Sequence, residues 1–311
     1  MKNFLKFISL IILISCEEII YPDLESKTPI LVVDAWLNNQ NESQTIILSS
    51  SQDYLDSTST KFIDGAEVYI INDNGDKFNF TEKDKGKYIW NPDSNFSNLG
   101  DVGTEFFLNI SYNGEKITGS STLNRTSIID SINFVKGEFP ENSYYAEFWS
   151  NEKEGVGDAY WIKSYKNGVK QVRSQDIITC IDAGASSEGA IIDGIPFIPP
   201  IRRAVTRFER DEISDEFKSP FEYGDSLYVE IHSIPFEAFD FLNKVSIQID
   251  RQGGFGELFA VSLANSPTNL TVENNSNFPV VGFFCVSAVN GMGNILDDDE
   301  IEKIEKYDRK W

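Results

Sequence analysis

Short runs of alternating apolar and polar residues, separated by turn residues, fill the chain from residue 30 to residue 123 and constrain its fold more than any other feature. A strand with one buried face repeats every two residues, whereas a helix repeats about every 3.6 residues. The Asn74-Gly75 and Asn113-Gly114 steps supply the positive φ angles that tight hairpins need. We therefore predict an Ig-like antiparallel β-sandwich over residues 30–126. Its strands are expected at residues 30–37, 44–49, 66–71, 77–80, 86–90, 104–112 and 115–123.

A second β-rich domain is predicted over residues 127–296, so the fold as a whole is expected to be mainly β. The aromatic share of 13% agrees with this prediction, because aromatic side chains favour strands. One amphipathic helix is expected near residues 234–249, where Ser233 can cap it and Pro235 suits its first turn. Its buried stripe would consist of Phe236, Phe239, Leu242, Val245 and Ile249. Further strands are expected at residues 128–134, 144–150, 159–165, 226–233 and 280–289.

Residues 174–219 are rich in Gly, Ile and Pro and show no regular period. A connection of this length inside a domain is usually functional or flexible, so we expect a binding surface here. Residues 297–311 are predicted to form a charged tail. The acidic run at 297–300 lacks the spacing of a calcium-binding loop, and we interpret it as a solvated segment.

The first sixteen residues predict secretion and lipidation. Lys2 and Lys6 accompany an apolar run at residues 7–14 that is too short to span a bilayer as a helix. This pattern is typical of a signal peptide, which we assign to residues 1–15. The run ends in Leu13-Ile14-Ser15-Cys16, which resembles the lipobox of bacterial lipoproteins. Cys16 would then carry the lipid and residues 16–29 would form an acidic tether; the alternative is a plain signal peptide with a coincidental Cys.

Two acidic residues, Glu17 and Glu18, directly follow Cys16 and resemble the surface-export signal of lipoproteins from several Bacteroidota. They predict a lipid-anchored protein of the outer membrane that is exposed at the cell surface. The formal net charge of −22 opposes binding to phosphodiester backbones, so nucleic acid is not an expected partner. The N-terminal lipid is the expected contact with the membrane.

The remaining thiols, Cys180 and Cys285, form either a disulfide or two free buried thiols. An oxidising envelope compartment permits the bond, whereas the apolar run around Cys285 favours a free thiol that packs as a small hydrophobe. His232 is the only histidine, and without a nucleophile motif we interpret it as structural. We predict no catalytic residue, no metal site and no cofactor.

Parts of the chain resemble known families. The segments 64–68, 74–75, 86–88, 106–110 and 113–114 are similar to the transthyretin-like domain of carboxypeptidase regulatory modules. Nearly the whole mature chain resembles a family of Bacteroidota lipoproteins known only as domain of unknown function 4249. Residues that carry this likeness lie at 16–20, 31–37, 130–132, 228–234, 239–242, 269–270 and 281–289. Family members usually have Ser or Ala in place of Cys285, and they are often encoded beside TonB-dependent outer-membrane receptors.

These features lead to one preferred hypothesis about function and two alternatives. The resemblance implies a non-enzymatic accessory or binding subunit of an outer-membrane barrel or TonB-dependent transport complex. The alternative is a separate surface module that binds a glycan or nutrient, with Trp149, Tyr160 and Trp161 as candidates for stacking on sugars, although aromatic residues that alternate in strands usually face the core. A hydrolase is the least favoured class, because nothing marks a catalytic pair among the many carboxylates.

Overall fold

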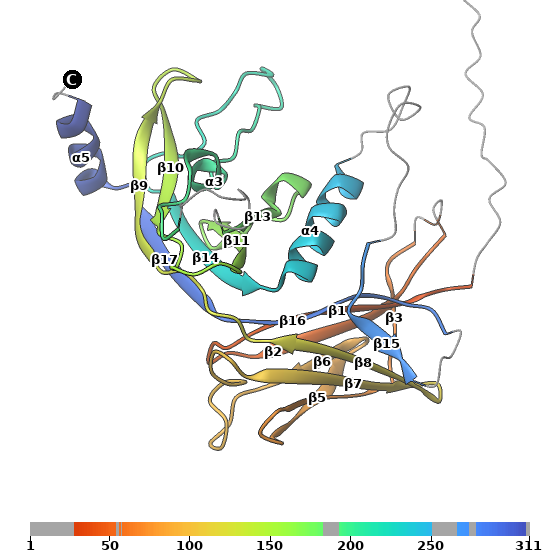
Figure 1. The fold of residues 1–311 in the computed structure, drawn as a ribbon. Coiled ribbons are helices and arrows are strands. Elements are labelled where there is room, and N and C mark those ends of the chain that lie inside the picture. Colours follow the sequence, from red (N-terminus) through yellow and green to blue (C-terminus); the bar gives the residue numbers. More distant parts are fainter. Residues whose placement is uncertain are drawn as a thin grey trace, which may run out of the picture.

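The computed structural model describes residues 28–53, 56, 58–182, 193–250, 266–273 and 278–308. Within these residues, ten strands form the larger sheet, shown in the lower half of Figure 1, in the order β15-β8-β7-β4-β5-β6-β2-β1-β16, with β3 paired to β2. Its strands are β1 (Leu31–Asn38), β2 (Gln44–Ser50), β3 (Lys61–Phe62), β4 (Glu67–Asn72), β5 (Lys77–Asp84), β6 (Lys87–Trp90), β7 (Glu105–Tyr112), β8 (Glu115–Thr122), β15 (Leu270–Val272) and β16 (Val280–Ser287).

The first half of β5 pairs with β4 and its second half pairs with β6, so this strand passes from one layer of the larger sheet to the other. The two layers enclose a core in which Phe78, Tyr88 and Phe106 are at most 1% exposed. Buried residues alternate with more exposed ones along β4 and β7, as the period of two predicts. The predicted mainly β fold with a sandwich in the N-terminal part is confirmed, and the predicted strands of residues 30–123 lie where the sequence places them.

Two strands of this sheet come from the end of the chain. β16 pairs parallel with β1 from Leu31↔Val280 to Asn38↔Ser287, and β15 pairs antiparallel with β8. The sequence pattern places residues 280–289 in the second domain, but in the structure β16 belongs to the larger sheet. The physical reason is that β16 is buried on both faces: Phe284 packs into the sandwich core, while Phe283 and Cys285 pack on the opposite side.

A single side chain joins β16 to β8 where the larger sheet approaches closure. The Asn269 amide donates to Ser120 O at 2.9 Å and to Phe284 O at 2.7 Å, and its oxygen accepts from Phe284 N–H at 3.0 Å. The side-chain amide of Asn269 thus makes the hydrogen bonds that a backbone peptide group would make between two paired strands. Val286 N–H adds a fourth contact by donating to Ser121 Oγ at 3.0 Å.

The second part of the molecule lies above the sandwich in Figure 1. Its main sheet has the order β12-β11-β14-β17, with β13 also paired to β11, and β9 and β10 form a separate antiparallel ribbon. The core of this part surrounds Phe148, Tyr160 and Ile231, which are fully buried. Its strands are β9 (Ile129–Gly137), β10 (Ser143–Ser150), β11 (Ala159–Lys166), β12 (Val169–Lys170), β13 (Ile178–Ile181), β14 (Ser226–Ile234) and β17 (Val289–Ile295).

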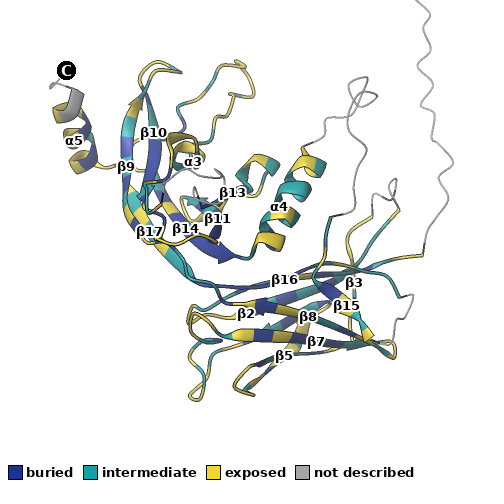
Figure 2. Ribbon diagram, in the orientation of Figure 1, coloured by how far each residue is buried: buried dark blue, intermediate teal, exposed yellow. Residues whose placement is uncertain are grey.

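The predicted helix is present as α4 (Phe236–Ile249), but it is capped and oriented differently. Pro235 occupies the N-cap, while Ser233 Oγ donates to Asn124 O at 2.6 Å and accepts from Ala288 N–H at 2.9 Å. The helix buries Ala238 and Leu242, whereas the predicted stripe residues Phe236 and Ile249 are exposed. Figure 2 shows α4 above the sandwich, with exposed and intermediate residues along the helix. The buried face packs on Phe283 and Cys285, which occupy the junction of the two parts.

The predicted charged tail is instead largely helical, as α5 (Asp298–Asp308). Asp297 Oδ1 accepts from Glu300 N–H at 3.1 Å, and the acids of the first turn favour the positive end of the helix dipole. Ile304 is 6% exposed and packs into the core of the second part. The connection at 174–219 is also partly regular, because it contains η1 (Ser174–Asp176), β13 and α3 (Pro199–Arg203).

Candidate functional site

The predicted lipidation and sorting residues, Cys16, Glu17 and Glu18, lie outside the described residues, as do the signal peptide and the tether up to residue 27. Among the helices that are described, none has the length and apolar character needed to cross a bilayer.

Of the two alternatives for Cys180 and Cys285, the structure shows the second: both are free, buried thiols in the described chain. Cys180 packs with Tyr160 and Phe197 in the core of the second part, whereas Cys285 packs beneath α4. Burial raises the pKa of Cys180 to about 12 and that of Cys285 to about 11. Both groups are therefore protonated at neutral pH and act as small apolar side chains.

His232 belongs to a hydrogen-bonded chain at the junction of the two parts. Its Nε2–H donates to Glu230 Oε2 at 2.9 Å, and its Nδ1 accepts from the Lys163 ammonium at 3.5 Å. Tyr165 OH donates to the same Glu230 oxygen at 3.0 Å. Burial and the nearby Lys163 charge lower the pKa of His232 to about 4, so the imidazole is neutral at pH 7. These contacts give His232 a structural role.

Lys163 is the most perturbed cation at this junction. Its ammonium lies 4.1 Å from the ring centroid of Trp161. Burial and the charge of Lys170 lower the pKa of Lys163 to about 8. Across the junction, Asp34 of β1 has a raised pKa, because desolvation outweighs the attraction of Lys170 and Lys163. Polar groups of both parts therefore meet here, beside the edge-to-face pair of Trp36 and Trp161 at 5.0 Å.

The aromatic residues considered for sugar stacking occupy three different environments. Tyr160 is fully buried, and its OH accepts a hydrogen bond from the Ser127 hydroxyl at 3.0 Å. Trp161 is partly buried between Trp36 and Lys163. Trp149 is also partly buried, and the Arg202 guanidinium covers one of its faces at 3.6 Å. The structure does not bring the three together into one aromatic platform.

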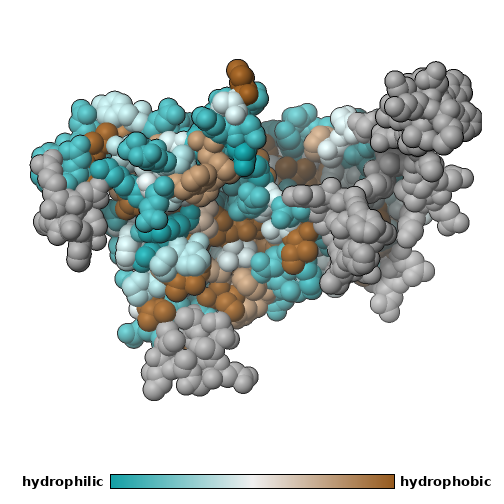
Figure 3. Space-filling view, turned by 90° about the horizontal axis from the view of Figure 1, so that it is seen from above, coloured by the Kyte–Doolittle hydropathy of each residue, from teal (hydrophilic) through white to brown (hydrophobic). Residues whose placement is uncertain are grey.

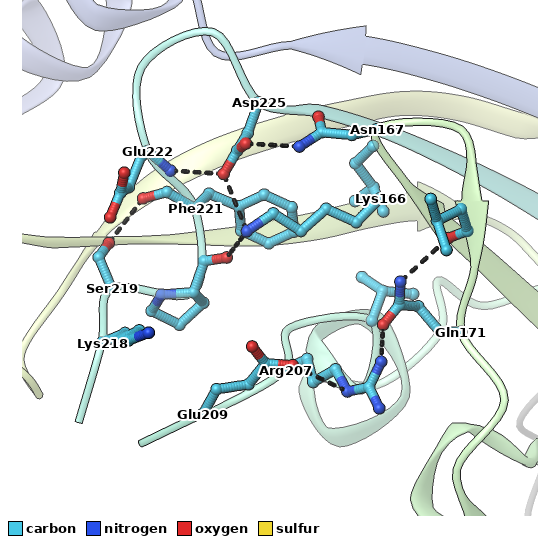
Figure 4. A pocket seen from close by; sticks show the side chains of 14 residues that line it. Lys166, Asn167, Gln171, Arg207, Glu209, Lys218, Ser219, Phe221, Glu222 and Asp225 are labelled. Atoms are coloured by element: carbon cyan, nitrogen blue, oxygen red, sulfur yellow. Dashed lines mark hydrogen bonds and ion pairs between the residues drawn. The ribbon is translucent and has the colours of Figure 1, made fainter. Parts of the chain in front are cut away.

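A pocket of about 410 Å³ lies where the turn between β11 and β12 faces the segment 205–222 (Figure 4). The segment 174–219, on which a binding surface is expected, supplies part of the pocket wall. Residues from that connection are Val205, Arg207, Glu209, Lys218 and Ser219. The floor contains Phe221, which is 2% exposed and lies 5.3 Å from the Lys166 ammonium. The binding surface expected on residues 174–219 stays a prediction, and no sequence motif marked the residues that line this pocket.

Ion pairs brace the walls of this pocket. Lys166 Nζ donates to Pro220 O at 2.9 Å and pairs with Asp225 at 2.9 Å. Desolvation opposes ionisation of Asp225, but hydrogen bonds from Asn167 and Lys166 outweigh it and lower its pKa. On the opposite wall, Arg207 donates to Gln171 and lies 3.5 Å from Glu209 (Figure 4). The paired side chains of Lys166, Asp225, Arg207 and Glu209 give the pocket polar walls.

Three carboxylates, Glu152, Asp182 and Asp193, offer oxygen atoms within 4.8 Å of one another and could hold a cation. Sequence reasoning missed this cluster because its members are widely separated along the chain. Backbone donors already occupy part of it: Gly155 N–H donates to both Asp193 oxygens at 3.0 Å, and Gly157 N–H donates to Asp182 at 3.0 Å. The cluster therefore braces the turn that precedes β11.

Exposed apolar side chains gather near the tip of the β9–β10 hairpin. Phe139 stacks edge-to-face on Phe217 at 5.0 Å, and Tyr145 on Phe208 at 5.2 Å. Phe139 is 56% exposed and Ile213, in the neighbouring loop, is 98% exposed. We call residues 139, 208, 213 and 217 the apolar tip. In the view from above, apolar side chains are exposed among hydrophilic ones on this side of the molecule (Figure 3).

The fold defines a mainly β protein in which two sheet systems share one chain and meet at an aromatic and charged junction. The chain belongs to the family described as a domain of unknown function (DUF4249), whose model matches residues 17–291. A comparison with curated proteins finds no match.

Proposed function

We propose that this protein is a lipid-anchored, surface-exposed lipoprotein of the outer membrane and acts as a non-enzymatic accessory or binding subunit of an outer-membrane barrel or TonB-dependent transport complex. The observation that carries the proposal is the Leu13-Ile14-Ser15-Cys16 sequence at the end of a short apolar run. An acyl anchor holds a protein at a membrane through its buried methylenes. The body of the protein can then contact a neighbouring membrane protein.

The apolar tip is the part of the surface best suited to such a partner. Ile213 is almost completely exposed, and no fold requirement explains an isoleucine in that position. Acidic residues flank it on both sides: Asp211, Glu212, Asp215 and Glu216. An apolar centre with a charged rim is typical of protein interfaces, and the acidic rim favours a partner with basic residues around an apolar pocket.

A role in binding also agrees with the protonation state and the contacts of the histidine. The only histidine is buried, hydrogen-bonded on both nitrogens and neutral at pH 7. General acid-base chemistry near neutral pH needs a group with a pKa close to the working pH and access to a substrate. His232 meets neither condition, which supports a structural role for the residue.

Membrane fractionation tests the anchor. Cys16→Ala should move the protein from the outer-membrane fraction to a soluble or retained precursor form, because the proposed attachment is a thioether to Cys16. Cys180→Ala is the matched control, since it removes a buried thiol without touching the anchor. A Cys16→Ala protein that still floats with outer membranes at high salt would contradict the proposal.

Surface proteolysis tests the sorting signal separately. Replacing Glu17 and Glu18 by Gln should reduce cleavage by protease added to intact cells, while the protein stays membrane-bound. Asp23→Asn with Glu25→Gln is the control, because it removes the same charge from a later part of the tether. Equal cleavage of both double variants would show that the acidic pair at 17–18 is not the signal.

Crosslinking and affinity purification test the partner. Ile213→Asp should abolish recovery of a co-purifying outer-membrane barrel, because a charge would enter the apolar contact. Val156→Asp is the control: Val156 is 71% exposed but lies in a different loop. Recovery of the barrel with Ile213→Asp would refute the role of the apolar tip. Retention on immobilised glycan in place of a barrel would favour the alternative of a separate glycan-binding module.

A further inference from the structure

A second pocket, of about 560 Å³, lies between the β9–β10 ribbon and the helices α3 and α5. Its apolar lining comes from Phe134, Val135 and Ile304. Its size is within the range of pockets that hold small organic ligands. No sequence motif marks this pocket, because its walls come from three segments far apart in the chain.

Basic side chains gather in this pocket although the chain as a whole is strongly acidic. The cationic lining residues are Lys136, Arg202, Arg203 and Lys303. Two carboxylates accompany them, and each is paired: Glu147 with Arg203 at 2.5 Å, and Glu300 with Lys303 at 2.5 Å. Arg203 and Lys303 are thus compensated by carboxylates within the pocket.

Arg202 differs from the other arginines of this region. Its guanidinium stacks on Trp149 at 3.6 Å from the ring centroid. Within the described part of the chain, its Nε is shielded from solvent without a hydrogen-bond acceptor, and no carboxylate pairs with the group. Arg210 offers a direct comparison: it stacks on Phe217 at 4.1 Å, but Asp215 neutralises it at 3.1 Å.

A stacked guanidinium without a carboxylate is well prepared to bind an anion. Stacking on the indole restricts the side chain, and the guanidinium lines the pocket, where its terminal N–H groups can form two parallel hydrogen bonds to an oxyanion. Such charge-assisted bonds are about twice as strong as neutral ones. Because the ordering of the side chain is already achieved in the free protein, little conformational entropy is lost on binding.

We propose that this pocket binds a small organic carboxylate, with its carboxylate on Arg202 and its apolar body against Val135 and Ile304. The large negative charge of the protein disfavours polyanions at long range, which selects a singly charged ligand over a phosphorylated one. The apolar lining selects a ligand with a hydrocarbon or aromatic body over a bare inorganic anion. This site is independent of the lipid anchor and of the apolar tip.

Titration calorimetry with the full-length chain tests the proposal on the wild-type protein first. The probes are 2-naphthoate, its neutral analogue 2-naphthamide and its dianionic analogue 2-naphthyl phosphate. At a modest ligand efficiency of about 0.3 kcal/mol per heavy atom, 2-naphthoate should bind with a dissociation constant of about 1 mM or tighter. The amide should bind at least tenfold more weakly. Equal binding of acid and amide would overturn the proposal, and tighter binding of the phosphate would overturn the carboxylate assignment.

Variants then locate the site. Arg202→Gln should weaken 2-naphthoate binding roughly tenfold to hundredfold, because both charge-assisted hydrogen bonds are lost. Arg202→Lys should bind with intermediate affinity, since it keeps the charge but loses the planar fork. Arg210→Gln is the control and should bind as the wild type does, because its guanidinium is already paired outside the pocket. Unchanged affinity of a folded Arg202→Gln protein would refute the site.

Discussion

Gly282→Ala should destabilise the contact between β1 and β16 by more than the cost of placing an alanine at the positive φ angle of residue 282. Gly282 has φ +107°, a region that L-residues rarely adopt, and it lies opposite Val33 in the parallel pair. A Cβ atom at this position would lie 1.9 Å from Val33 O, 2.8 Å from Val33 C and 2.9 Å from Val33 N. The neighbouring atoms are backbone, so no side-chain rotation can relieve the contact.

Two costs contribute to the expected change in the free energy of unfolding. The positive φ angle costs of order 1–3 kcal/mol in a residue with a Cβ atom. Restoring an ordinary contact distance requires β16 to move by about 1.5 Å from β1, which is enough to break the hydrogen bonds on either side of Val33. The lost bonds and the displacement of fully buried Phe284 add roughly 2–4 kcal/mol.

Gly103 supplies the matched control. Its φ is +100°, and a Cβ atom there would meet nothing within 4 Å, so Gly103→Ala measures the conformational cost without the contact. We expect urea denaturation of the full-length variants, followed by circular dichroism and tryptophan fluorescence, to show an excess destabilisation of roughly 2–4 kcal/mol for Gly282→Ala over Gly103→Ala. Equal destabilisation, within about 1 kcal/mol, would refute a close parallel pairing of β16 with β1.

Three further predictions concern stability. Asn269→Ala should lower the free energy of unfolding by about 2–3 kcal/mol, because three hydrogen bonds between β8 and β16 are lost; a change below about 0.5 kcal/mol would contradict this role. A fragment that ends at Asn124 lacks β15 and β16, which leaves the edges of β8 and β1 unpaired, so we expect it to aggregate or bind hydrophobic dyes. A soluble fragment with dispersed amide signals in its NMR spectrum would contradict this expectation. The pKa of His232 is about 4 in the folded protein and about 6.5 in the unfolded chain, so the unfolded chain binds more protons between these pH values. The free energy of unfolding should therefore fall by up to about 3 kcal/mol as the pH drops from 6.5 to 4. His232→Gln should remove this part of the pH dependence in denaturation curves, and an unchanged slope would argue against the buried neutral imidazole.

Local pattern predicts the position of most strands but not their partners. The segments 44–49 and 104–112 alternate clearly, and the corresponding strands β2 and β7 are found there. The pairing of β1 with β16 joins residues about 250 positions apart, and no local signal encodes it. The continuous apolar run of β16 was the available clue, since a strand buried on both faces loses its alternation.

Helix α5 and the carboxylate pocket show two other limits. The acidic start of α5 suggested a solvated tail, although Ile301 and Ile304 stand three residues apart on one helical face and pack inward. Trp149 and Arg202 come together through folding alone, because they belong to β10 and α3 and share no motif. The sequence contains one sign of a basic cluster in the second part of the chain: all arginines follow Asn124, and four of them lie between residues 202 and 210.

The parallel pairing of β1 with β16 has a mechanical consequence. Tension applied through the chain before Leu31 enters β1 at its first residue, while load from the second part of the molecule enters β16 through Ala288, next to its last residue. In a parallel pair these two pulls act along the strands in opposite directions, so they shear the whole ladder from Leu31↔Val280 to Asn38↔Ser287 at once. A hairpin pulled from its open end would instead unzip one pair at a time. Load that enters the chain at Leu31 and leaves it at Ala288 is therefore resisted by all the pairs of this ladder at once.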